Sequence, residues 1–128
     1  MNNYEQFFMQ YRNELSNRLL QFSVKIIIFS RKLPVNIEFK IIKNQLIRST
    51  TSAGANYVES QSTSSIADFR HKIRISLKEI SESSYWIELL KEIYDDRLLN
   101  KETTTLLKES IELQKILGKI NKKVTVTK

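Results

Sequence analysis

The chain contains one histidine, His71, which lies three residues after Asp68. On a helix this i, i+3 spacing is half of the carboxylate and histidine set that holds two metal ions in some four-helix bundles. Such a site needs a second motif of the same kind, which one histidine cannot supply. The chain also lacks cysteine, and this excludes disulfides and thiolate metal sites. We therefore expect no metal and no cofactor, and Asp68 is better explained as a helix cap.

The pattern of nucleophiles and acids does not indicate catalysis. His71 has no serine or cysteine in a recognisable setting for a catalytic triad. Acid–base chemistry would have to use the four glutamates of one stretch, which are Glu79, Glu82, Glu88 and Glu92. On a long helix such glutamates are more often solvated or paired with a lysine three or four residues away. We expect the protein not to be an enzyme.

Basic side chains do have a spacing that suggests a function. Arg70, Arg74 and Lys78 stand at i, i+4 and i+8, so they share one stripe of a helix. Cations in such a row can follow a phosphate backbone and replace its condensed counterions. The alternative is an ordinary solvated face. The candidate nucleic-acid contacts are Lys40, Lys43, Arg70, Lys72, Arg74 and Lys78.

The formal net charge of +7 is unevenly distributed. Residues 1–78 hold 12 basic and 5 acidic side chains, residues 79–118 hold 5 and 9, and the last ten residues add 4 lysines. A segregated positive field suggests an anionic partner, with nucleic acid as the obvious candidate. A charge that serves only solubility is the alternative.

A run of small residues interrupts the apolar pattern in "QLIRSTTSAGANYVESQ", residues 45–61. A phosphate-binding loop would need several glycines before a lysine, and only Gly54 is present. Ser49, Ala53 and Asn56 recur at helical spacing, which favours a helix that a neighbouring helix approaches closely. Gly54 in mid-helix costs about 1 kcal/mol relative to alanine, so we expect a packing reason for it.

Buried serine and asparagine side chains on this face need hydrogen-bond partners. We expect carbonyls one turn back, or polar groups such as Glu79, Ser83 or Ser84 on the next helix. Two roles stay open for Arg48, which are a contact to nucleic acid and a salt bridge to Glu59 or to Glu79 of a neighbour. The predicted polar seam consists of Gln45, Arg48, Ser49, Ser52, Asn56, Glu59 and Glu79.

Apolar residues recur every three or four positions in four segments, and this period is typical of helices. The predicted helices span about 4–31, 36–61, 65–95 and 101–120, with Pro34 ending the first and Ser65 capping the third. In the first, Phe8 and Tyr11 belong to the apolar stripe. The chain has only two glycines and one proline, which also favours an all-α fold.

These helices predict an antiparallel up-down-up-down four-helix bundle over residues 1–121, followed by a basic flexible tail over 122–128. Tyr57, Tyr85 and Trp86 are predicted core or subunit-interface anchors. Base stacking is the alternative for Tyr85 and Trp86. No apolar run is long enough to span a bilayer, so we expect a soluble, cytoplasmic protein without membrane contact.

Residues 45–61, with "SIADFRHKIRISLKEISESSYW" at 65–86, resemble the 23S ribosomal RNA intervening-sequence proteins. Thr50, Ala53 and Ser60 depart from the family pattern by small or apolar exchanges. The residues that match this pattern are Gln45, Leu46, Arg48, Ser49, Thr51, Ser52, Gly54, Ala55, Asn56, Tyr57, Glu59, Gln61, Ser65, Asp68, Phe69, Lys72, Ile75, Leu77, Lys78, Glu79, Glu82, Tyr85 and Trp86.

The resemblance implies a homopentamer of four-helix bundles. It also implies a relation to an accessory protein of diversity-generating retroelements, which works with a reverse transcriptase and binds nucleic acid through a basic surface. Charge and resemblance together predict a non-enzymatic oligomeric bundle that binds nucleic acid, with structured RNA favoured, mainly through phosphates. A reverse transcriptase or another RNA-associated protein is a further expected partner. The alternative function is a protein–protein adaptor or scaffold that docks an acidic partner protein.

Overall fold

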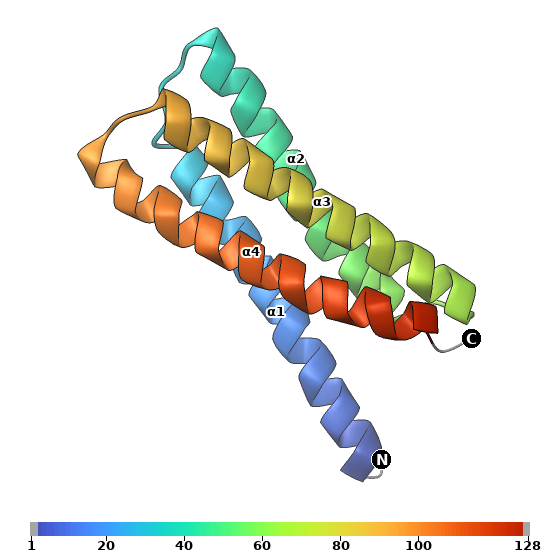
Figure 1. Ribbon diagram of the computed structural model, residues 1–128. Helices are drawn as coiled ribbons and strands as arrows, with labels where there is room; N and C mark the ends of the chain where they lie inside the picture. The colour runs from blue at the N-terminus through green and yellow to red at the C-terminus, as the bar shows by residue number, and fades with distance from the viewer. Residues whose placement is uncertain (1–2, 127–128) are drawn as a thin grey trace.

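Four long helices make up the protein in a computed structural model (Figure 1). The structure describes the backbone of residues 3–126 and the side chains of residues 14–125. Between residues 3 and 126 there is no strand, so the all-α prediction is confirmed. The helices are α1 (Asn3–Ser30), α2 (Ile37–Ser60), α3 (Ile66–Ile93) and α4 (Arg97–Val126).

The first three helices begin and end within two residues of their predicted bounds. Pro34 lies in the α1–α2 connection, where it cannot continue a helical hydrogen-bond ladder. The Ser65 side chain caps α3 by accepting a hydrogen bond from the Asp68 amide at 3.1 Å. Asn36 occupies the N-cap of α2 but makes no side-chain capping bond. Phe8 and Tyr11 lie outside the described side chains.

The predicted bounds of α4 are wrong at both ends. The helix begins at Arg97 because the Asp96 carboxylate accepts hydrogen bonds from the Leu98 and Leu99 amides, at 2.9 and 3.3 Å. It continues to Val126, so residues 122–126 are helical rather than a flexible tail. One guanidinium nitrogen of Arg70 donates to the Val124 carbonyl at 3.2 Å and anchors the last turns to α3. Thr127 and Lys128 lie outside the described residues.

The helices form a closed set of neighbours, with α1 and α3 packing on both α2 and α4. The α1–α2 and α3–α4 connections lie at one end of the molecule, and the α2–α3 connection lies at the other (Figure 1). Between residues 3 and 126, no helix combines the length and apolarity needed to cross a bilayer.

The core is built from apolar rows that face the centre of the molecule. Ile73, Ile80 and Ile87 repeat every seven residues along α3 and are 0% exposed. Tyr57, a predicted core or subunit-interface anchor, is 2% exposed and belongs to this core. The other helices contribute Leu15, Leu19, Phe22, Ile26, Phe29, Phe39, Ile42, Leu46, Ala53, Leu99, Leu106, Leu113 and Leu117.

Small side chains line the buried contact between α2 and α3. The Ser83 hydroxyl lies 2.8 Å from the Ser49 hydroxyl and 2.9 Å from the Thr50 hydroxyl. The Ser76 hydroxyl donates to the Ala53 carbonyl at 2.7 Å. These hydroxyls are buried and find partners across the contact, where an unpartnered polar group would cost about 1–3 kcal/mol. The predicted close approach of another helix to residues 49–53 is therefore confirmed.

Gly54 itself is not required for that approach, contrary to the sequence-based expectation. A Cβ atom at this position would lie 3.7 Å from the Leu19 Cβ and 4.0 Å from the Ser23 hydroxyl, which are ordinary van der Waals contacts. We therefore predict that Gly54→Ala stabilises the fold by about 0.5–1 kcal/mol through helix propensity. Urea unfolding of both proteins tests this. A lower midpoint for the variant would show that the glycine has a steric role.

Candidate nucleic-acid interface

The relative positions of α3 and α4 follow from two contacts between them. Arg70, near the start of α3, bonds to Val124, near the end of α4. Further along, the Ser84 hydroxyl donates to the Ser110 hydroxyl at 2.8 Å. The first half of α3 therefore lies beside the second half of α4.

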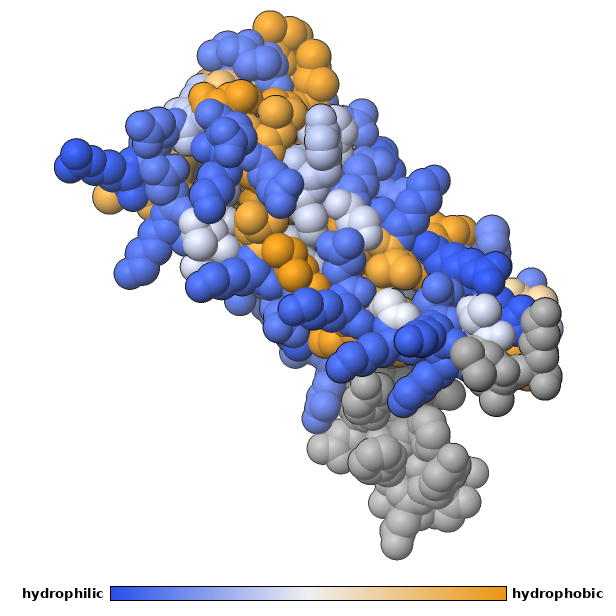
Figure 2. Space-filling view, viewed as in Figure 1, coloured by the Kyte–Doolittle hydropathy of each residue, from blue (hydrophilic) through white to orange (hydrophobic). Residues whose placement is uncertain are grey.

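Each of these half-helices contains one stretch that carries only positive charge, between Asp68 and Glu79 on α3 and after Glu112 on α4. Residues 69–78 and 113–125 together contain eight lysines and arginines and no aspartate or glutamate. Hydrophilic side chains cover most of the α3–α4 side of the molecule in Figure 2. We use the term basic face for five of these eight cations, all of which are exposed. They are Arg74, Lys78, Lys115, Lys119 and Lys122.

Two further sequence-predicted contacts lie on the same half of α3 but make structural bonds. The Lys72 ammonium lies 2.7 Å from a Glu59 carboxylate oxygen and links α3 to α2. Arg70 is half-buried, bonds to the Val124 carbonyl, and keeps its Nε buried without a hydrogen-bond partner among the described residues. Their contribution to a ligand is therefore limited by contacts already made within the fold.

Lys40 and Lys43 lie at the other end of the molecule. The neighbouring Phe39 ring packs edge-on against Tyr94 with centroids 5.3 Å apart, which places this part of α2 beside the end of α3. Lys40 is exposed and Lys43 is half-buried. The six sequence-predicted contacts therefore do not form one continuous surface.

The predicted polar seam contains an ion network between α2 and α3. Arg48 pairs with Glu79 at 2.9 Å and with Glu82, and its Nε donates to the Gln45 side chain at 3.1 Å. The Trp86 indole N–H donates to the same Glu82 carboxylate at 3.0 Å. Arg48 thus forms a salt bridge with Glu79 of its own chain and not with Glu59. This network fixes the position of α2 on α3 at the surface.

The remaining members of the seam use both kinds of partner that were expected, carbonyls one turn back and polar groups on α3. The Asn56 amide donates to the Ser52 carbonyl at 2.9 Å and to the Ser52 hydroxyl at 3.1 Å, so both residues bond within α2. Glu59 joins α2 to α3 through Lys72. Ser49 is the member that bonds across the buried interface.

The three predicted aromatic anchors have different environments. Tyr57 is buried, Trp86 is half-buried, and Tyr85 is 58% exposed. The Tyr85 and Trp86 rings pack edge-on, with centroids 5.1 Å apart and planes at 74°. Tyr85 is therefore not a core residue of this chain.

Residues 12–119 match the family described as 23S rRNA-intervening sequence protein. The chain belongs to this family. It is also similar to the crystal structure of a protein of unknown function from the S23 ribosomal protein family of Bacteroides thetaiotaomicron, with 37% identity and a TM-score of 0.74. That similarity covers 87% of this chain and 97% of the other. No curated protein matches the chain. The resemblance inferred from residues 45–86 is thus confirmed.

Three lysines of the basic face were not among the nucleic-acid contacts predicted from the sequence. Lys115, Lys119 and Lys122 stand at i, i+4 and i+7 on α4, so they share one side of the helix. The spacing was visible in the sequence. Lys122 had been assigned to a flexible tail, and Lys115 and Lys119 alone form too short a row to stand out from an ordinary solvated face.

The carboxylate of Glu82 predicts a pH dependence of stability. The Trp86 indole N–H, together with the Arg48 guanidinium, holds the pKa of Glu82 below its ordinary value. A carboxyl group whose pKa is lower in the folded state than in the unfolded state contributes stability at pH values above its unfolded-state pKa. This contribution is lost as the pH falls through the folded-state pKa. We therefore predict that Glu82→Gln flattens the acid side of the stability profile.

This prediction can be measured by urea unfolding at a series of pH values from neutral to acidic, with Trp86 fluorescence as the signal. Glu88→Gln, at an exposed glutamate of the same helix, is the matched control. An equal loss of stability with acid in the wild type and in Glu82→Gln would contradict the assignment.

Proposed function

We propose that this protein is a non-enzymatic, oligomeric bundle that binds structured RNA through phosphate contacts on the basic face. The observation that carries the proposal is the absence of any acidic residue among the eight basic ones of residues 69–78 and 113–125. A surface with one sign of charge attracts a polyanion and raises its rate of association.

The arrangement of the cations supports contacts to phosphates rather than to bases. Arg74 and Lys78 come from α3, and the three lysines come from α4, so the cations form two rows. Axes of packed helices are about 8–10 Å apart, and flexible lysines on such rows adapt to many backbone paths. Phosphate contacts carry no direct sequence information, so we expect low sequence specificity.

RNA is favoured over DNA by the family to which the chain belongs, because its description refers to ribosomal RNA. A test is titration of a labelled, structured RNA at rising salt concentration. We expect log Kobs to fall linearly with log[salt], with a slope of about −0.7 to −0.9 for each phosphate contact. A flat plot, or no binding at low salt, would refute the proposal. Stronger binding to a DNA duplex of the same sequence would indicate that the ligand is DNA and not RNA.

We further propose that the functional unit is a homopentamer of antiparallel up-down-up-down bundles. A ring would repeat the basic face and so increase affinity for one long polyanion. Exposed apolar side chains support subunit contacts, because Leu20, Val24 and Val58 line an apolar groove of about 530 Å³ between α1 and α2. Native mass measurement should give about 75 kDa, five times the 15.1 kDa of one chain, after nuclease treatment. A mass of one or two chains would exclude the pentamer.

The same cations would also fit an acidic protein surface, which keeps the adaptor function as a second candidate. A reverse transcriptase or another RNA-associated protein would be a partner in either case. A pull-down after nuclease treatment separates the two functions. Recovery of one acidic protein, with no affinity for RNA, would favour the adaptor.

A further inference from the structure

An exposed aromatic ring lies on α3 beyond the end of the basic face. Tyr85 follows Arg74 by eleven residues, which is close to three helical turns, so the two side chains leave the helix on the same side. Tyr85 follows Lys78 by seven residues, or about 10 Å along the helix axis at 1.5 Å per residue. A strand that binds Lys78 through a phosphate is therefore within a few nucleotides of the tyrosine.

The tyrosine ring is held in place by its neighbours. It packs edge-on against Trp86, whose indole N–H is fixed by the Glu82 carboxylate, and Glu82 in turn pairs with Arg48. The Tyr85 ring is 58% exposed and packs on Trp86. A flat ligand can therefore stack on its exposed surface while the tyrosine side chain loses little conformational freedom.

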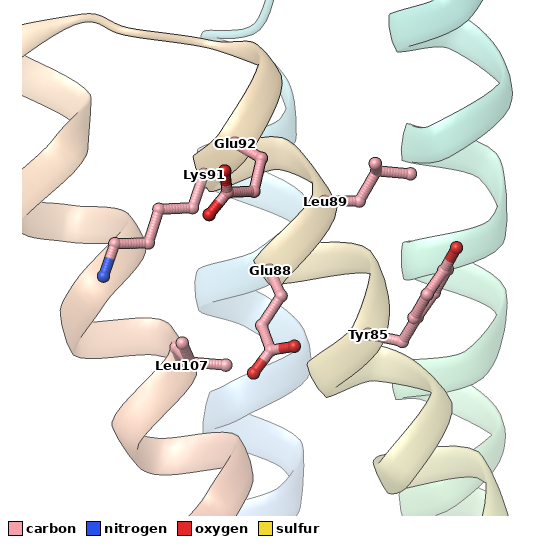
Figure 3. A pocket seen from close by; sticks show the side chains of 6 residues that line it. All are labelled: Tyr85, Glu88, Leu89, Lys91, Glu92 and Leu107. Atoms are coloured by element: carbon pink, nitrogen blue, oxygen red, sulfur yellow. The ribbon is translucent and has the colours of Figure 1, made fainter.

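A hollow of about 500 Å³ adjoins this ring (Figure 3). Tyr85 and Leu89 project on one side of α3, Leu107 lies on α4, and Glu88 projects between them. Glu92 and Lys91 complete the lining. The hollow thus combines apolar walls with carboxylates at its centre and upper edge.

The carboxylates restrict what can bind in this hollow. An ionised carboxylate accepts hydrogen bonds and cannot donate them. It repels phosphates, which keeps the backbone of a bound strand on the basic face. It accepts well from an exocyclic amino group, as glutamate does from the cytosine amino group, whereas the two carbonyl oxygens of uracil would face it unfavourably.

We infer that this hollow binds one unpaired nucleobase that carries an exocyclic amino group, stacked on Tyr85 and hydrogen-bonded to Glu88. The inference rests on the proposed function and adds a base-binding site to a surface that otherwise contacts only phosphates. The strand leaves the basic face at Lys78, and its next unpaired base enters the hollow.

The test compares three forms of one RNA hairpin. The first has a blunt end, the second carries a short cytidine tail, and the third carries a short uridine tail. Each tail is placed at the 5′ end in one RNA and at the 3′ end in another. A tail of cytidines at one end should raise the affinity about 10-fold over the blunt hairpin, in line with the effect of stacking one base on an aromatic side chain. The uridine tail should raise it less.

Variants of the hollow separate stacking from hydrogen bonding. Tyr85→Ala should abolish the gain from the tail and leave blunt-hairpin affinity and helical content unchanged, while Tyr85→Phe should retain the gain. Glu88→Gln should reduce the preference for cytidine over uridine, because an amide can also donate. Equal affinities for blunt and tailed hairpins, or a gain that persists in Tyr85→Ala, would overturn the inference while leaving the proposed function intact. Failure of every hairpin to bind would refute the proposed function itself.

Discussion

Replacement of Arg74, Lys78 and Lys119 together by glutamate is expected to weaken binding to structured RNA by at least about 100-fold, because three phosphate contacts become three repulsions. The magnitude of the salt slope should fall by about 3, since each lost phosphate contact lowers it by about one. All three residues are exposed, so helical content should not change. Fluorescence anisotropy at several salt concentrations gives both quantities.

The matched control changes the net charge by the same amount at another place. R97E/K101E/K108E reverses three exposed cations on the first half of α4, which also carries Glu102 and Glu109. We expect a loss of only a few-fold, which reflects the lower overall charge. Equal losses in the two triple variants would show that RNA responds to net charge and not to the basic face.

Ile80→Ala is expected to destabilise the protein by about 2–5 kcal/mol, as other isoleucine truncations in closed cores do. Ile80 is 0% exposed and lies between Ile73 and Ile87 in the central row of α3. The surrounding long helices cannot move in to fill the space that the truncation leaves. Urea unfolding at a fixed protein concentration measures the effect, because subunit association also contributes to apparent stability.

Ile111→Ala provides the control for this truncation. Ile111 is 38% exposed on α4, so the same substitution removes little buried surface and should change stability by less than about 0.5 kcal/mol. If both variants lost the same stability, the heptad row would not be the centre of the core.

Much of this fold could be predicted from the sequence because its signals are local and consistent. The apolar period marks the helices, Pro34 separates α1 from α2, and Ser65 caps α3. Ser49 and Ser83 could be paired in advance, since a buried hydroxyl needs a partner and the facing helix offers one.

The errors arose where tertiary contacts or competing local signals decide the structure. The start of α4 was predicted at residue 101, because Asn100 and Thr103 can also cap a helix, but Asp96 takes the N-cap position. The alternation of valine and threonine after residue 123 is strand-like, yet Arg70 bonds to the Val124 carbonyl and residues 122–126 remain helical.

Only the α3 part of the basic face was predicted from the sequence, for a related reason. Helical spacing identifies residues that share one side of one helix, such as Arg74 and Lys78. It does not reveal that Lys119 lies on the neighbouring helix or that Lys40 lies at the far end of the bundle. That information is in the register between helices, which is fixed by contacts between residues distant in sequence, such as Arg70 with Val124 and Ser84 with Ser110.

The most direct test of the account is a lysine-labelling footprint of the wild-type protein with and without structured RNA. Mass spectrometry reports the labelling of each lysine, so the contact surface is located without any substitution. The account predicts protection of Lys78, Lys115, Lys119 and Lys122, and unchanged labelling of Lys40, Lys101 and Lys108. Protection of the second group without the first, or RNA binding with no protection of the first group, would contradict it.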